Sequence, residues 1–161
     1  MLAQSAEHSA VSPDLMKGYE MLNSKQKGNL TEMQCMASFI KLGYNVLIPF
    51  GDCERYDFVA DIKDIFLKIQ CKSASTKDNG DSISIECRST HYKDGHCIHE
   101  KYDKNQIDYI ATYWNEKCYL IPVEECGSAK KLRFSIPENF QKERISFAKE
   151  YELEFILNKY H

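Results

Sequence analysis

Three polar residues that could hold a metal ion and assist a hydrolysis lie close together in the sequence: Asp57, Gln70 and Lys72. A carboxylate and an amide carbonyl are hard oxygen donors of the kind that Mg²⁺ prefers, and the backbone carbonyl of Cys71 could supply another. A lysine ammonium can orient a water molecule or offset negative charge on a phosphate oxygen. Together these groups would be equipped for hydrolysis of a phosphodiester bond.

A predicted β-hairpin of residues 56–62 and 65–71 would bring these groups together. With a two-residue turn at Lys63 and Asp64, apolar residues pair along one face of the hairpin. The pairs are Phe58 with Ile69, Ala60 with Leu67 and Ile62 with Ile65. The opposite face carries Asp57, Asp61, Lys68, Gln70 and Lys72. Asp57 then lies across from Gln70, with Cβ atoms about 4.5–5.5 Å apart, although the turn lacks the usual glycine.

The rest of the chain predicts a helix, about six strands and a final helix. The first helix covers residues 24–42, with Leu30, Met33, Ala37 and Ile40 at helical spacing. Asn23 or Ser24 could cap its start, and Gly43 is a stop signal. The further strands are residues 45–48, 83–87, 109–114, 118–122 and 131–134, with a connection at 115–117, and the final helix covers residues 140–159. This order predicts an α/β or α+β domain with a mixed, mostly antiparallel central sheet flanked by helices.

Composition indicates a single domain without a membrane partner. The 161 residues are 43% hydrophobic and no apolar run approaches the length of a membrane helix. A net charge of −3 excludes a protein that coats nucleic acid through a general basic surplus. Seven cysteines without a Cys-x2-Cys pair indicate reduced core thiols, and hence a cytoplasmic location. Residues 1–23 are expected to be an extension, and residues 24–161 the domain.

Several short segments occur in a characteristic order from about residue 25 to the C-terminus. They are Lys27-Gly28-x3-Glu32, Gly43-Tyr44-x-Val46, Pro49-Phe50-Gly51-Asp52-x2-Arg55-Tyr56-Asp57, Ile69-Gln70-Cys71-Lys72-Ser73, Gln106-Ile107-Asp108-Tyr109 and Tyr119-Leu120-Ile121-Pro122. With these segments the chain resembles the PD-(D/E)XK nucleases, in particular small homing-endonuclease-like and Holliday-junction-resolvase-like members. The resemblance implies a restriction-endonuclease-like core and a Mg²⁺-dependent DNA endonuclease, with Mn²⁺ able to substitute and with no small organic cofactor.

The resemblance also implies roles for individual residues. Glu32 would be the helix-borne acid and a metal ligand, Asp57 the central metal ligand, and Lys72 the motif lysine. Gln70 stands where the family has Asp or Glu, so the site has one negative charge fewer. That departure favours an alternative, a catalytically inactive nuclease fold that serves DNA binding or assembly. A third hypothesis is a small structural α/β protein in which the match is coincidental.

Plainer interpretations stand beside these. Glu32 could close a capping box with Asn29, and the polar hairpin face could simply be the solvated one. The cluster of His91, His96, Cys97 and His99 matches no standard zinc spacing and indicates a surface loop that could touch DNA. The candidate DNA contacts are Lys27, Arg55, Ser73, Arg88, Lys93 and Lys104. A domain this small covers little DNA, so a homodimer or homotetramer is expected for cutting both strands.

Overall fold

A computed structural model of the chain describes residues 18, 21–136 and 145–160. Its helices are α2 (Ser24–Lys41) and α3 (Leu153–Leu157), with 3₁₀ turns at Asp78–Gly80, Val123–Glu125, Ala148–Tyr151 and Asn158–Tyr160. Its strands are β1 (Asn45–Leu47), β2 (Phe58–Ile62), β3 (Ile65–Cys71), β4 (Ala74–Lys77), β5 (Ser82–Glu86), β6 (Arg88–Lys93), β7 (His96–Lys101), β8 (Tyr109–Trp114), β9 (Lys117–Pro122) and β10 (Ala129–Arg133).

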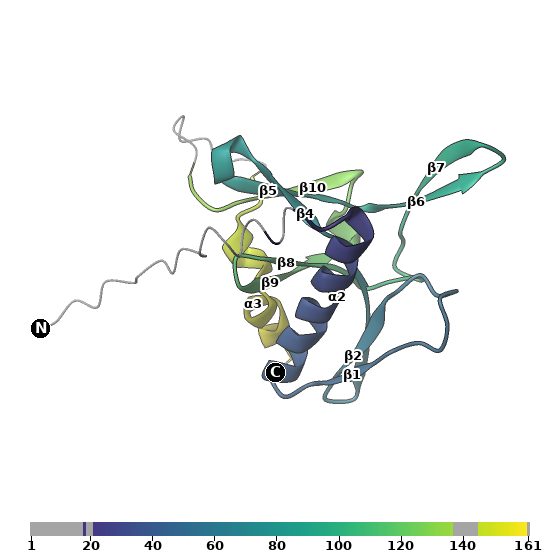
Figure 1. Ribbon diagram of the computed structural model, residues 1–161. Helices are drawn as coiled ribbons and strands as arrows, with labels where there is room; N and C mark the ends of the chain where they lie inside the picture. The colour runs from purple at the N-terminus through teal and green to yellow at the C-terminus, as the bar shows by residue number, and fades with distance from the viewer. Residues whose placement is uncertain (1–17, 19–20, 137–144, 161) are drawn as a thin grey trace, which may run out of the picture.

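The strands form a central sheet, a smaller sheet and a separate two-stranded arm. The central sheet has the order β1-β2-β3-β8-β9, and the smaller sheet has the order β10-β5-β4. Within the described strands, the β3–β8 pair is parallel and the other pairs are antiparallel. Strands β6 and β7 pair only with each other and project from the body of the molecule (Figure 1). This is the mixed, mostly antiparallel α+β architecture predicted from the sequence.

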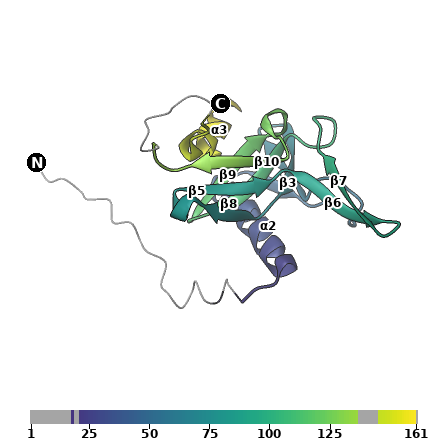
Figure 2. The same cartoon turned by 90° about the horizontal axis from the view of Figure 1, so that it is seen from above.

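Two clusters of buried residues lie on the two faces of the central sheet. One cluster joins Cys35 and Phe39 of α2 and Leu153 and Leu157 of α3 to the sheet. The other joins Ile110 and Ile121 of the central sheet to Ile83, Ile85 and Leu132 of the smaller sheet. Figure 2 shows the smaller sheet stacked over β8 and β9, with α2 beyond the central sheet. The hairpin β2–β3 is therefore held in place through its apolar face.

The hairpin register predicted from apolar alternation is confirmed. Phe58 pairs with Ile69, Ala60 with Leu67 and Ile62 with Ile65, and all three β2 members of these pairs are fully buried. Lys63 and Asp64 form the turn with φ of 51° and 70°, so two non-glycine residues adopt the left-handed conformation that a tight hairpin requires. The backbone N–H of Asp64 donates to Asp61 Oδ1 at 3.1 Å, which helps to hold this turn.

Replacing Asp64 by glycine is expected to stabilise the protein by about 0.5 kcal/mol. Glycine removes the steric cost of a positive φ at that position, and this outweighs the extra freedom it gives the unfolded chain. Asp81 has a φ of −72°, so glycine relieves no strain there, and Asp81→Gly, which also removes the ion pair with Arg133, should lower stability. The measurement is urea unfolding of both variants. A loss of stability in Asp64→Gly as large as in Asp81→Gly would contradict the prediction.

The first helix lies where the sequence predicted, but a different face is buried. Asn23 caps it and exchanges two hydrogen bonds with Gln26 at 2.9 and 3.0 Å. The buried residues are Thr31, Cys35 and Phe39, whereas the predicted core residues Met33 and Ile40 are 64% and 60% exposed and Ala37 is also exposed. The apolar pattern of this helix is weak, and a satisfied threonine hydroxyl takes a core position.

Two other expectations about secondary structure are wrong. The surface loop expected around His91 to His99 is instead formed by β6 and β7, paired from Arg88 with Lys101 to Lys93 with His96. The single helix expected over residues 140–159 is interrupted, because Phe147 bridges to Arg133 in extended conformation and only Leu153–Leu157 is α-helical. Residues 140–144 of that prediction lie outside the described residues, as does most of the expected extension, residues 1–23.

Smaller differences concern strand ends and cysteines. β4 and its polar sequence were not predicted, and the 115–117 connection is a two-residue turn, Asn115 and Glu116, with φ of 47° and 62°. All seven thiols are free: Cys35, Cys71, Cys87 and Cys118 are buried as predicted, whereas Cys53 and Cys97 are exposed. No helix within the described ranges is long and apolar enough to cross a membrane.

Candidate functional site

Asp57, Gln70 and the backbone of Cys71 meet at the open end of the β2–β3 hairpin. The backbone N–H of Asp57 donates to Ile69 O at 2.8 Å and extends the ladder by one residue beyond β2. Oδ2 of Asp57 accepts two hydrogen bonds, from Gln70 Nε2 at 2.8 Å and from the Cys71 backbone N–H at 2.6 Å. The predicted juxtaposition of Asp57 and Gln70 is therefore present.

The Gln70 amide nitrogen lies at a point on which two oxygen atoms converge, Asp57 Oδ2 and the Cys71 carbonyl oxygen. Nε2 donates to Asp57 Oδ2 and, at 3.2 Å, to the Cys71 carbonyl. A partly positive donor thus sits between a carboxylate and a carbonyl oxygen. A glutamine presents either its nitrogen or its oxygen to such a point after rotation about the last side-chain bond. The Asp57 carboxylate, the Cys71 carbonyl and the Gln70 amide oxygen would suit a hard divalent cation, since all three are oxygen ligands of the kind that Mg²⁺ takes.

Asp57 is held in an environment that disfavours its own charge. Burial raises the pKa of the Asp57 carboxyl, and this effect exceeds the lowering by the Cys71 hydrogen bond, the Lys72 charge and the Gln70 hydrogen bond. A carboxylate kept ionised against such desolvation gains from a nearby positive charge. The electrostatics therefore favour a cation at this position.

Glu32 projects from α2 towards the same place. Burial and the negative charge of Asp57 both raise the pKa of Glu32, so the two carboxyl groups lie within electrostatic reach of each other. The capping-box alternative with Asn29 is wrong, because the helix begins at Ser24 and the capping partners are Asn23 and Gln26. Glu32 instead lies inside the helix, half-buried, beside the buried Thr31.

A hydroxyl pair fixes α2 against the segment between β3 and β4, which contains Lys72 and Ser73. Thr31 Oγ1 donates to Lys27 O at 2.9 Å and lies 3.0 Å from Ser73 Oγ. Because the single Thr31 proton is already used, Ser73 is the donor in the second bond. Ser73, expected as a DNA contact, therefore donates its hydroxyl hydrogen bond to Thr31 of the helix. Sequence reasoning missed Thr31, since a buried threonine gives no hydropathy signal.

Lys72 completes the group. Its backbone N–H donates to Ala111 O at 2.9 Å, which ties the end of β3 to β8. Its Nζ lies 5.4 Å from the ring centroid of Tyr102, and the guanidinium carbon of Arg55 lies 5.0 Å from the same centroid. Arg55 and Lys72 are therefore both at the site, and Tyr102 is a contact that sequence reasoning did not find.

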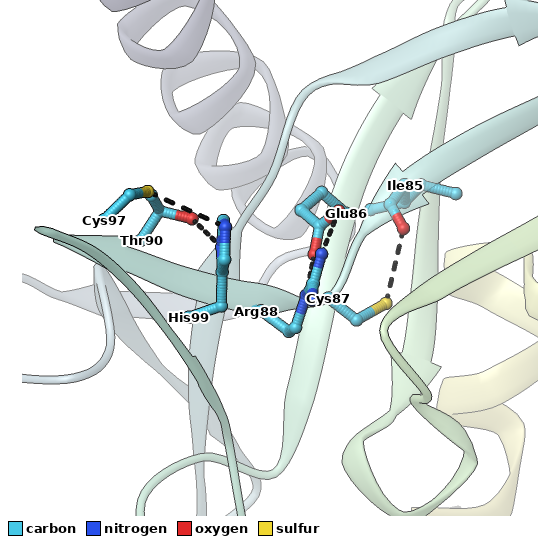
Figure 3. Close-up of polar contacts among 7 residues, drawn as sticks. All are labelled: Ile85, Glu86, Cys87, Arg88, Thr90, Cys97 and His99. Atoms are coloured by element: carbon cyan, nitrogen blue, oxygen red, sulfur yellow. Dashed lines mark hydrogen bonds and ion pairs between the residues drawn. The ribbon is translucent and has the colours of Figure 1, made fainter.

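The remaining candidate DNA contacts lie farther out. Arg88 is at the base of the arm and pairs with Glu86 at 2.6 Å, whereas Lys93 is near the arm tip (Figure 3 shows the arm base). Lys104 pairs with Glu124 at 2.5 Å. Lys27 lies in the first turns of α2. The structure thus brings Arg55 to the acidic site, and spreads Arg88, Lys93, Lys104 and Lys27 over the surface around it.

The histidine-rich cluster does not close into a metal site. His99 bonds Thr90 through Nδ1 at 2.9 Å and lies 3.7 Å from the Cys97 sulfur through Nε2, as Figure 3 shows. Alternation along the arm places His91 and His96 away from that pair. Across the described part of the chain, no three His, Cys, Asp or Glu side chains gather as metal ligands. The acidic site therefore relies on an amide and a carbonyl beside its two carboxylates.

The sequence profile of the PD-(D/E)XK endonucleases matches residues 22–154. The match covers most of the chain, and the protein belongs to this family. A nuclease with a restriction-endonuclease-like fold is the class that the fold and the match define.

Among solved structures, the chain is similar to a bacterial homing endonuclease, I-Ssp6803I. The two share 26% sequence identity with a TM-score of 0.67, over 86% of this chain and 95% of that one. No curated protein matches the chain.

Proposed function

We propose that this protein is a Mg²⁺-dependent DNA endonuclease of the homing-endonuclease-like or junction-resolvase-like kind. The observation that carries the proposal is the convergence of Asp57, Gln70 and the Cys71 carbonyl on one point, with Lys72 alongside. Membership of the endonuclease family and the similarity to I-Ssp6803I support it.

Each group has a role in this proposal. Asp57, Gln70 and the Cys71 carbonyl would hold the metal ion, and Glu32 would add negative charge from the helix side. The ion, when bound, supplies positive charge that favours the hydroxide form of water and offsets charge on the phosphate. Lys72 orients the attacking water or donates to a phosphate oxygen. Glu32 is suited to take up a proton from that water, because its raised pKa makes its carboxylate more basic than an ordinary glutamate.

DNA would lie across the site and the surrounding basic residues. Arg55 faces the site, while Arg88 and Lys93 lie on the arm that projects beside it. Such contacts with phosphates position a duplex without reading its sequence. Cutting both strands calls for two sites, so the proposal includes a symmetric homodimer or homotetramer.

The direct test is incubation with supercoiled plasmid, linear duplex and four-way-junction DNA, with Mg²⁺, Mn²⁺ or EDTA. Cleavage that requires a divalent ion supports the proposal, and the preferred substrate separates the two kinds of endonuclease. Gel-shift binding without cleavage in either metal would instead select the alternative, a nuclease fold that binds DNA without turnover. Gln70 is the observation that favours this alternative, because it removes one anionic ligand.

Replacing Gln70 by glutamate is expected to tighten Mg²⁺ binding by about tenfold or more. The change restores a second carboxylate next to Asp57, and a charged oxygen binds a divalent cation more strongly than an amide does. Without metal, the same change should lower stability, because two carboxylates then share the point that Gln70 Nε2 now occupies. Thermal unfolding at increasing Mg²⁺ concentration measures both effects at once.

Gln106→Glu is a matched control for that experiment, since Gln106 is half-buried as Gln70 is, but its side chain accepts a hydrogen bond from the Asp103 backbone N–H and not from the acidic site. Its unfolding temperature should respond to Mg²⁺ as the parent's does. An identical Mg²⁺ response in Gln70→Glu and Gln106→Glu would remove Gln70 from the metal site.

A further inference from the structure

The Tyr102 ring lies between the hydrophobic core and two cations. Tyr102 directly follows β7, at the point where the arm rejoins the body of the molecule. It is half-buried and packs against the core cluster between the two sheets. The Lys72 ammonium and the Arg55 guanidinium lie 5.4 and 5.0 Å from its centroid. Both distances are within the range in which a cation is attracted to an aromatic face.

Lys72 depends on such a contact for its position. Its backbone is fixed by Ala111, but four methylene groups separate that backbone from the ammonium. An ion pair with a carboxylate would hold the ammonium, yet it would also occupy its N–H donors. An aromatic face attracts the charge through the ring quadrupole without forming strong hydrogen bonds to all three N–H groups. The ring thus holds the ammonium in a form that is still able to donate to a substrate.

Arg55 extends the arrangement to the arm. Its Nη1 donates to Ser89 Oγ at 3.4 Å and its Nη2 pairs with Glu100 at 3.3 Å. Ser89 and Glu100 are directly opposite each other on β6 and β7, so one guanidinium contacts both strands of the arm. Its Nε is buried, and within the described part of the chain it has no hydrogen-bond partner. The Tyr102 ring and the two arm residues therefore fix the position of the Arg55 guanidinium together.

We propose that Tyr102 is a positioning residue, whose ring holds Lys72 and Arg55 at the acidic site and joins that site to the base of the β6–β7 arm. The inference rests on the proposed nuclease function for the chemical meaning of Lys72, but the contacts themselves do not. Tyr102 does not touch the reacting atoms. It acts through the two cations, and the path from arm to site runs through Glu100 and Ser89, Arg55, Tyr102 and Lys72.

The test varies how strongly the side chain at position 102 attracts a cation, and most of the variants keep an aromatic ring there. Tyr102→Phe retains the ring, Tyr102→Leu removes it, and phenylalanines with one to four ring fluorines at position 102 weaken the attraction for cations stepwise. We expect single-turnover cleavage to stay near the parental rate in Tyr102→Phe, to fall stepwise with fluorination, and to fall about tenfold in Tyr102→Leu. The fluorinated series keeps the side-chain volume and protects the test from misfolding of Tyr102→Leu.

A second readout does not depend on cleavage. A methylene group that lies against an aromatic ring has an upfield-shifted proton signal, so the ε-methylene of Lys72 should show this shift in ¹³C-lysine-labelled protein. The shift should persist in Tyr102→Phe and vanish in Tyr102→Leu. Lys159, whose Nζ lies 5.1 and 5.4 Å from the Tyr109 and Tyr160 rings, is the internal reference and should not change.

The outcomes separate the two proposals. A parent that cleaves DNA, together with a Tyr102→Leu variant or fluorinated series that cleaves equally fast, overturns the role of Tyr102 and leaves the nuclease function standing. A missing upfield shift of Lys72 in the parent also overturns the role of Tyr102. A parent that cleaves no DNA with Mg²⁺ or Mn²⁺ overturns the nuclease function, and the positioning role with it, even if the Lys72 shift is present.

Discussion

Replacing Asp57 by asparagine is expected to reduce DNA cleavage by about a thousandfold or more without destabilising the folded protein. Asparagine keeps the shape of the side chain but removes the charge that holds the cation. Both hydrogen bonds to Asp57 end on one oxygen, Oδ2, so the single amide oxygen of asparagine can accept them both. Single-turnover cleavage and thermal unfolding of the same preparation measure the two effects.

The stability effect follows from the direction of the Asp57 pKa. Burial raises this pKa in the folded state, so the folded protein takes up a proton more readily than the unfolded chain does. The ionised carboxylate therefore weakens folding at neutral pH, and this penalty is relieved as the pH falls through the raised pKa. Without metal, Asp57→Asn should be at least as stable as the parent at pH 7, and its advantage should shrink in mild acid.

Asp61→Asn is the matched control, because Asp61 lies on the same strand and the same face but contacts the turn at Asp64. It should cleave DNA as the parent does. Equal cleavage by Asp57→Asn and Asp61→Asn would mean that the acidic site is elsewhere. A clear loss of stability in Asp57→Asn at pH 7 would mean that the carboxylate is better solvated than its burial indicates.

Replacing Lys72 by methionine is expected to lower single-turnover cleavage by about a hundredfold or more, while DNA binding changes little. Methionine keeps much of the apolar stem and removes the ammonium that would orient water or donate to a phosphate oxygen. DNA affinity should weaken only slightly, since one positive charge among several is lost. Cleavage under saturating protein and a gel shift with Ca²⁺ in place of Mg²⁺ separate the two quantities.

Lys68→Met provides the comparison, since Lys68 lies in β3, the strand that Lys72 directly follows, and donates to Asn105 O at 2.5 Å. It should retain cleavage. Lys72→Met has a further consequence, because the Lys72 charge helps to lower the pKa of Asp57. Without that charge the Asp57 pKa rises, so divalent-ion binding should weaken at a higher pH than in the parent. Parental cleavage by Lys72→Met would remove the lysine from the reaction.

The centre of the site could be predicted because hairpin register is a local property. Apolar residues at every second position of both strands leave one pairing, and that pairing places Asp57 across from Gln70. A turn without glycine did not prevent it, since Lys63 and Asp64 adopt the positive φ values themselves. Strand β8, the neighbour of β3 in the central sheet, could be predicted for a different local reason, because all but its last two residues are buried and its sequence is a nearly continuous apolar run.

The elements that could not be predicted are those whose structure depends on contacts with residues far away in the sequence. No residue of the β6–β7 arm is buried on either face, so its sequence carries no apolar alternation to reveal strands. The buried face of α2 depends on a hydroxyl pair, Thr31 with Ser73, that hydropathy does not register. Tyr102 escaped for a similar reason, since it meets Arg55 and Lys72 only after the arm and the hairpin have both folded.

The contact between the buried Thr31 hydroxyl and the half-buried Ser73 hydroxyl fixes the rotation of α2 about its own axis. Thr31 and Phe39 lie at the two ends of the buried face of α2 and anchor the helix there. The direction of the Glu32 side chain follows from its position one residue after Thr31. Successive residues of an α-helix are about 100° apart around its axis. One residue inserted between Glu32 and Phe39 would therefore leave either the acid or the aromatic anchor misdirected. Insertion of about seven residues, two full turns, would restore the alignment, so the helix tolerates length changes only in whole turns.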